Sequence, residues 1–286
     1  MANFKLYLKP NSFLNNMNLL NQKGIFRFCF LYLLSLLSTY SHSAIVILNG
    51  LSHKYTIQSG ELYKGIIEIS NTSPTPQGVK LYQTDYTFSS NGTIDYGKPG
   101  SLKRSNALWI ELGETFFVLG ALEKRVVNFQ ILVPKDDTLL GTFWSVIMVE
   151  GLAPPDTVKP KGQVMVNTVT RYGIQIITTT GGNGKRELIF NESKLEKRED
   201  KRFLVIDAKN TGDFLLEPLM ICELFDSASN KIKVMAKNRK KLFPNTSTLF
   251  DIDISEIKAG TYNALILADC DDDDAFGIQV SLKLNE

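Results

Sequence analysis

Short apolar stretches separated by polar turns run along most of the chain, and several of them alternate apolar and polar positions. In "KRVVNFQILVP" (124–134), Val127, Phe129 and Ile131 share one face of an extended strand, while Asn128 and Gln130 share the other. These stretches are rich in the β-branched and aromatic residues that favour strands. No segment carries an apolar stripe with the 3.6-residue period of a helix. The pattern predicts an all-β protein.

The predicted strands form two groups on either side of a glycine-rich break, "TTGGNGKR" (179–186). The first group covers 63–71, 78–88, 106–112, 124–134, 141–151 and 166–179. The second covers 186–190, 202–212, 215–227, 231–235, 247–255, 260–270 and 276–284. Short strands joined by turns rich in Gly, Pro, Asn and Asp are typical of sandwiches. We expect two immunoglobulin-like β-sandwich domains in tandem, at 44–180 and 186–286, with a linker at 181–185.

Residues 1–43 differ from the rest of the chain because they combine basic residues, an apolar run and a small-residue ending. They contain four of the 32 basic residues and none of the 30 acidic ones. The run from Ile25 to Leu37 precedes Ser41 and Ser43, which stand three and one positions before Ala44. This order predicts a secretory signal peptide at 1–43 that is cleaved before Ala44. The alternative is a retained anchor, although an apolar run of about 13 residues is short for a bilayer.

Cleavage there leaves a periplasmic or secreted chain with no stable membrane anchor and a formal net charge of −2. Nothing in this charge suggests nucleic acid as a partner. Only His53, Cys222 and Cys270 remain as histidine and cysteine side chains, which argues against a Ser-His-Asp triad and against a zinc site. We therefore expect no enzyme and no cofactor. Paired carboxylates for glycoside hydrolysis are the alternative, with candidates at Asp85, Asp95, Glu111 and Glu150.

Cys222 and Cys270 fall in strands that an immunoglobulin-like order makes sheet neighbours. A secreted protein meets oxidising conditions, which permit a disulfide between them. The geometry across neighbouring strands is demanding, and two free thiols are the alternative.

An acidic run, "DCDDDDAFG" (269–277), lies between the last two predicted strands. Asp269, Asp271 and Asp273 have the spacing that begins a calcium loop. The sixth position of that loop needs Gly and is Asp274, and the twelfth needs Glu and is Val280. The pattern favours a solvated hairpin tip and leaves weak calcium binding as the alternative.

Several segments resemble secreted proteins related to the periplasmic pilus-assembly chaperones. In the first domain they are "GIIEISNTS", "VKLYQTDYTF", "LVPKDD", "GTFWSVIMVEG" and "TRYGIQI"; in the second they are "VIDAKNTGDFLLEPLMICELFDSASNKI" and "AGTYNALILADCDDDDAFGIQVSL". The resemblance implies two immunoglobulin-like domains and a protein partner, such as a pilus-like or surface subunit. In the chaperones a basic pair holds the terminal carboxylate of that subunit. In the chaperones, the last strand of the first domain usually ends with Lys and Tyr-Arg-Pro. That ending is absent here, and Arg171 is the nearest equivalent of one basic residue.

The resemblance predicts an extracytoplasmic protein that binds partners by β-strand augmentation, as an assembly chaperone or an accessory of a surface structure. Arg171, Tyr172, Ile174 and Ile176 are the expected partner-binding residues, in an edge strand of the first domain. The alternative is a surface module that binds polysaccharide or matrix through exposed aromatics. Trp109 and Trp144 are candidates for this, although the parity of Trp144 with Val146 and Met148 favours the core.

Overall fold

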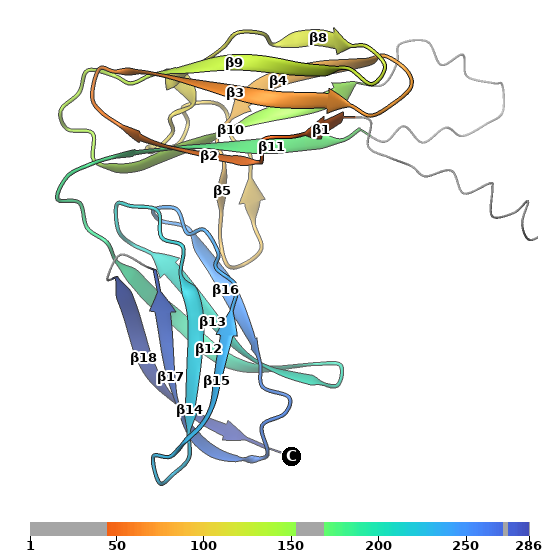
Figure 1. Ribbon diagram of the computed structural model, residues 1–286. Helices are drawn as coiled ribbons and strands as arrows, with labels where there is room; N and C mark the ends of the chain where they lie inside the picture. Colours follow the sequence, from red (N-terminus) through yellow and green to blue (C-terminus); the bar gives the residue numbers. More distant parts are fainter. Residues whose placement is uncertain (1–44, 153–168, 271–273, 286) are drawn as a thin grey trace, which may run out of the picture. The chain divides into compact units, whose positions relative to one another are not determined.

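The computed structural model describes residues 45–152, 169–270 and 274–285 (Figure 1). The segment from Ala44 to Glu286 is one compact unit. The predicted signal peptide lies outside the described residues. Within the described ranges, no helix is long and apolar enough to span a membrane.

The first sandwich consists of a four-stranded sheet in the order β1-β3-β9-β7 and a five-stranded sheet in the order β2-β11-β10-β4-β8. The strands are β1 (Ile45–Ile47), β2 (Ser52–Ile57), β3 (Leu62–Asn71), β4 (Gln77–Thr84), β7 (Ile110–Leu112), β8 (Phe116–Leu119), β9 (Lys124–Leu132), β10 (Gly141–Leu152) and β11 (Arg171–Thr180). A small hairpin of β5 (Thr87–Phe88) and β6 (Ile94–Asp95) and one 3-10 turn, η1 (Ala107–Trp109), lie between β4 and β7.

The second sandwich consists of a three-stranded sheet in the order β12-β13-β16 and a four-stranded sheet in the order β15-β14-β17-β18. The strands are β12 (Leu188–Arg198), β13 (Lys201–Asn210), β14 (Leu219–Phe225), β15 (Lys231–Lys237), β16 (Ser247–Asp253), β17 (Gly260–Asp269) and β18 (Ala275–Leu284). The predicted all-β fold with two immunoglobulin-like sandwiches is confirmed.

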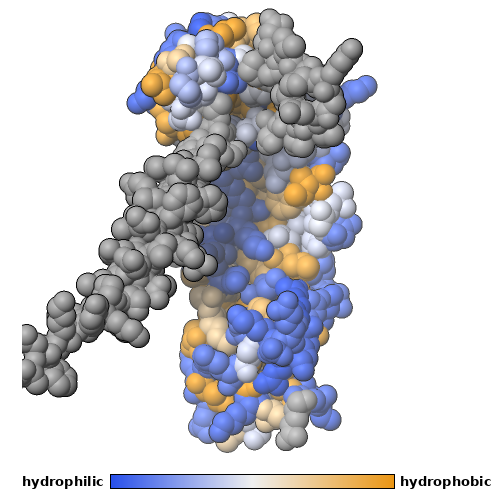
Figure 2. Space-filling view, turned by 90° about the vertical axis from the view of Figure 1, so that its right-hand side faces the viewer, coloured by the Kyte–Doolittle hydropathy of each residue, from blue (hydrophilic) through white to orange (hydrophobic). Residues whose placement is uncertain are grey.

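Each sandwich has its own apolar core between its two sheets. In the first, Ile67 and Ile69 of β3 are in one buried cluster with Ile147 and Val149 of β10. In the second, residues of β13 and β16 are in one buried cluster with residues of β14 and β17. Figure 2 shows a mainly hydrophilic surface over the face of the second sandwich that it presents, with hydrophobic residues scattered among the hydrophilic ones. The alternation along the strands thus separates buried from solvated positions.

The boundary of β4 differs from the prediction because a polar residue redirects the backbone. The strand predicted over 78–88 ends at Thr84, because the fully buried Asp85 carboxylate accepts hydrogen bonds from a following loop. The N–H groups of Gly100 and Leu102 donate to it at 3.1 and 2.7 Å. Strands β2 and β8 carry no sequence prediction, since β2 is largely polar and β8 has only four residues.

Candidate functional site

Strand β11 carries the residues assigned from the sequence to partner binding. From Gln175 to Thr180 it is not an edge strand, because β2 pairs with it in parallel. Ile174 and Ile176 are fully buried in the core of the first sandwich, and Tyr172 packs against that core. The two isoleucines therefore offer no surface to a partner, and their expected contact role is corrected to a core role. Alternation identified the strand but not which of its faces is covered.

Arg171 lies on the other face of β11, and 57% of its side chain is exposed. Its Nε donates to Glu150 Oε2 at 3.0 Å and its Nη2 to Glu150 Oε1 at 3.3 Å. The Tyr82 hydroxyl donates to the same carboxylate at 3.2 Å. The hydrogen bond that Arg171 donates to Glu150 raises the pKa of Arg171, while burial and then the charge of Glu150 raise the pKa of Tyr82. Arg171 thus has a carboxylate partner within its own sheet.

Strand β8 forms the outer edge of the five-stranded sheet, and among the described residues only β4 pairs with it. The Leu81 N–H donates to the Thr115 carbonyl at 2.8 Å, in the same register that places Val79 opposite Phe117. Hydrogen-bonded pairs alternate with non-hydrogen-bonded pairs along an antiparallel ladder, so the backbone N–H and C=O of Phe117 bond β4. The N–H and C=O groups of the residues on either side, Phe116 and Val118, point away from the sheet toward an open edge.

The side chains of Phe116 and Val118 add an apolar surface to this edge. They are 59% and 55% exposed, whereas Phe117 and Leu119 between and beyond them are buried. The register connects Phe116 through Lys80 and Glu150 to Arg171 in one row across the outward face. Three strand spacings, about 14 Å, separate Arg171 from β8. Sequence reasoning missed β8, although the run "FFVL" between Gly113 and Gly120 was a usable signal.

Two lysines lie where the two sandwiches meet, and sequence reasoning missed them as a pair. Lys241 Nζ donates to Ser52 Oγ at 2.6 Å and to Gln175 Oε1 at 3.0 Å, both on the first sandwich. Lys54 of β2 forms an ion pair with Glu217. Burial lowers the pKa of Lys241; the nearby charge of Glu217 raises it and that of Lys54 lowers it. Two ammonium groups and the carboxylate of Glu217 thus meet at this junction, where the Lys241 ammonium bonds neutral oxygens.

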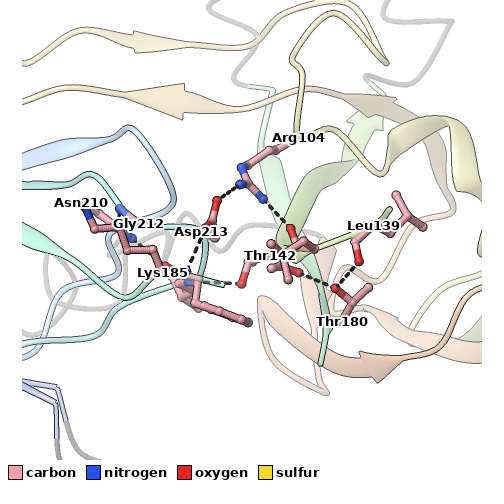
Figure 3. A network of polar contacts seen from close by, with 12 residues as sticks. Arg104, Leu139, Thr142, Thr180, Lys185, Asn210, Gly212 and Asp213 are labelled. Carbon is pink, nitrogen blue, oxygen red and sulfur yellow. Dashed lines mark hydrogen bonds and ion pairs between the residues drawn. The ribbon is translucent and has the colours of Figure 1, made fainter. Parts of the chain in front are cut away.

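The same junction is fixed by a polar network from both sandwiches and the segment between them (Figure 3). Arg104 pairs with Asp213 and donates from Nη1 to the Leu140 carbonyl at 2.8 Å. The Thr142 N–H donates to the Asp213 carbonyl at 2.8 Å, and the Lys185 N–H donates to the Asp213 carboxylate at 2.9 Å. These bonds hold the start of β10 against the turn that precedes β14.

Aromatic packing completes the junction. Trp144 stacks on Phe243 with ring centroids 4.6 Å apart, and Phe243 is fully buried. Only 3% of Trp144 is exposed, so it offers no platform for a sugar. Trp109 packs against Phe143 with centroids 4.9 Å apart. Trp144 is thus buried, but in a separate cluster with Ile177 and Phe243 and not in the core of the first sandwich that its parity favoured.

Cys222 and Cys270 are both buried free thiols. Their strands, β14 and β17, are sheet neighbours, but Cys222 is opposite Ile266, four residues before Cys270. That offset is about 13 Å along a strand, beyond the roughly 7 Å between Cα atoms that a disulfide spans. Burial raises the pKa of each thiol to about 11. Cys222 and Cys270 are therefore two free thiols and do not form a disulfide.

The acidic run joins β17 to β18 as the predicted hairpin. The Cys270 N–H donates to the Asp274 carbonyl at 2.9 Å, and Asp274 pairs with Arg186 at 3.3 Å. Of the calcium candidates, Asp271 and Asp273 lie outside the described residues, and Asp269 ends β17. Within the described ranges, no group of three His, Cys, Asp or Glu side chains could hold a metal ion.

The fold and the open edge of β8 together define an all-β protein of two sandwiches with a free strand edge. Solved structures to which the chain is similar include several chaperones. They are the class 5 fimbriae chaperone CfaA (13% identity, 85% of this chain and 100% of that chain, TM-score 0.46) and the YadV chaperone (12%, 84% and 100%, TM-score 0.44). A third is the Pseudomonas aeruginosa chaperone CupB2 (11%, 84% and 100%, TM-score 0.39). No protein-family model and no curated protein matches the chain.

Proposed function

We propose that the chain is an extracytoplasmic protein-binding protein, an assembly chaperone or accessory of a surface structure, that receives an extended partner segment by strand addition. The observation that carries the proposal is the open edge of β8. Among the residues that the structure describes, the backbone groups of Phe116 and Val118 have no strand partner on that side, and their apolar side chains are exposed. Backbone bonds supply affinity in this mode of recognition, and alternate side chains supply specificity. The sequence of residues 1–43 supports a periplasmic or secreted location.

Arg171 remains in the proposal as a charged contact on the same outward face. Its guanidinium uses Nε and Nη2 for Glu150, and the side chain is more than half exposed. A partner carboxylate reaching this end of the sheet gains a charge-assisted bond. Tyr172, Ile174 and Ile176 support the strand from the core side.

The lysines at the junction extend the proposal to the end of the partner chain. Lys54 and Lys241 come from different sandwiches, and the nearby charge of Lys54 lowers the pKa of Lys241. We expect them to hold the terminal carboxylate of the partner, the task that the resembled chaperones give to a basic pair.

The test is affinity purification of partners from the envelope of the source cells with matched variants. Val118→Pro removes an N–H that faces the open edge and leaves the bonds to β4 intact, so partner capture is expected to fall at least tenfold while the fold is kept. Ser281→Pro makes the same change on an edge of the second sandwich and is expected to keep the partner. Capture that survives Val118→Pro contradicts the proposal.

The same assay separates the junction from the edge. Lys241→Met is expected to weaken capture, and Lys240→Met is its matched control, because the Lys240 ammonium bonds only the Leu249 carbonyl among the described residues. Equal capture by both variants removes the junction from the proposal and leaves the role of β8 standing. Arg171→Ala is expected to weaken capture without unfolding the protein, and unchanged capture removes Arg171.

A further inference from the structure

Strand β18 is a second open edge, longer than β8 and almost uncharged. It is the outer strand of its sheet, and within the described residues only β17 pairs with it. Lys283 is the one charged residue among its ten. The opposite edge of the same sheet, β15, has three lysines in seven residues. Charges on an edge strand block pairing with another chain, so β15 is guarded against pairing and β18 is not.

The register shows which backbone groups of β18 face outward. The Cys270 N–H donates to the Asp274 carbonyl, and continuing this register places Ile266 opposite Ile278 as a bonded pair. Because bonding alternates along the ladder, the five residues between the bonded ones direct both N–H and C=O to the free edge. These residues are Ala275, Gly277, Gln279, Ser281 and Lys283, and all five are exposed.

This edge is complementary to itself. Antiparallel pairing of two copies about Gln279 places Gln279 opposite its own equivalent, Gly277 opposite Ser281, and Ala275 opposite Lys283. It is the register that uses all five outward residues, and it forms about ten hydrogen bonds between chains. Nothing bulky stands on the outward face of these pairs, since the residues there are mostly small.

Charge and apolar burial favour the same register. Lys283 of one copy lies in a row with Ala275 and Asp269 of the other, so its long side chain extends past a small residue toward a carboxylate. Within its own chain that carboxylate pairs with Arg239 at 4.0 Å, so Lys283 is a second cation beside it. The two copies of Lys283 lie at opposite ends of the ladder. Phe276, Ile278 and Val280 are only partly buried at the rim of the core, and an added strand covers them further.

We propose that two copies of this chain associate through β18 into a symmetric dimer with one continuous sheet. The contact is isologous, as a two-fold axis through Gln279 requires. It involves a different sandwich from the strand addition proposed at β8, so either proposal can fail alone.

The test is sedimentation equilibrium of the chain from Ala44, which forms a compact unit by itself. The unchanged chain is expected to show a monomer–dimer equilibrium. Ser281→Pro removes an N–H that faces the free edge, and its dimer dissociation constant is expected to rise at least tenfold with an unchanged circular dichroism spectrum. Val118→Pro, on the other open edge, is expected to dimerise like the unchanged chain. A chain that stays monomeric at every concentration overturns the proposal, as does a dimer that Ser281→Pro leaves intact.

Cysteine cross-linking tests the register itself. Residues in a bonded antiparallel pair have Cα atoms about 5.5 Å apart, within disulfide range. Gln279→Cys is therefore expected to form a covalent dimer under mild oxidation. Ser281→Cys is the matched control, because its equivalent in the other copy lies four positions along the ladder. Cross-linking of the control as fast as Gln279→Cys contradicts the two-fold register about Gln279.

Discussion

At Gly141 the backbone of β10 passes directly beside the Asp213 carbonyl of the second sandwich. The residue has a φ of +85°, and a Cβ placed on it would lie 2.1 Å from that oxygen. The adjoining Thr142 N–H donates to the same carbonyl. A side chain is thus excluded here by both backbone conformation and space.

Gly141→Ala is expected to lower the free energy of unfolding by more than about 1 kcal/mol, because the methyl group forces the junction apart. Gly181→Ala is the matched control, since nothing lies within 4 Å of the added Cβ. Urea denaturation of both variants measures the difference. Equal stability of the two variants argues against close packing at the junction.

The two buried thiols give a second prediction for single residues. With a pKa of about 11 each, Cys222 and Cys270 stay protonated at pH 8 and are shielded from reagents. A thiol-specific chromogenic reagent is expected to react slowly with the folded chain from Ala44 and to detect two thiols after denaturation without reductant. No thiols after denaturation would instead indicate a disulfide.

Single strands show how far the sequence predicts this fold and where it stops. Strands β3, β9, β10 and β17 are long, apolar and regular, so composition and alternation are enough to place them. Strand β2 has one fully buried residue, Ile57, and gives almost no apolar signal. Its pairing with β11 is nonlocal, and it decides that most of β11 is interior.

The candidate site was predictable only in part for the same reason. The sequence suggested strand addition to the first sandwich, but an open edge depends on which strands are neighbours. The Arg171 side chain is exposed, whereas the side chains of Ile174 and Ile176 point into the core. The pair of Lys54 and Lys241 is 187 positions apart in the chain and comes together only through the packing of two sandwiches.

At the scale of the molecule, Phe243 joins the two sandwiches through a third buried cluster. It is fully buried, stacks on Trp144, and meets Tyr86 and Phe88 edge-on. One aromatic side chain from the second sandwich thus contacts three aromatic residues of the first. The packing predicts that the stability of the junction depends strongly on this ring.

Phe243→Ala is expected to cost about 3–5 kcal/mol of unfolding free energy, the range for deletion of a buried aromatic side chain. Phe116→Ala, the same change at an exposed position, is expected to cost less than about 0.5 kcal/mol. Chemical denaturation followed by tryptophan fluorescence reports both values. Similar costs for the two variants would contradict the proposed role of Phe243.

The most direct test of partner binding at β8 is hydrogen exchange at the Phe116 and Val118 amides. Both N–H groups face the open edge in the chain alone, so fast exchange is predicted for them and slow exchange for Phe117 between them. Addition of the captured partner is predicted to slow exchange at Phe116 and Val118, because an added strand bonds them. Amides that are protected without a partner, or that exchange equally fast with one, would contradict strand addition at this edge.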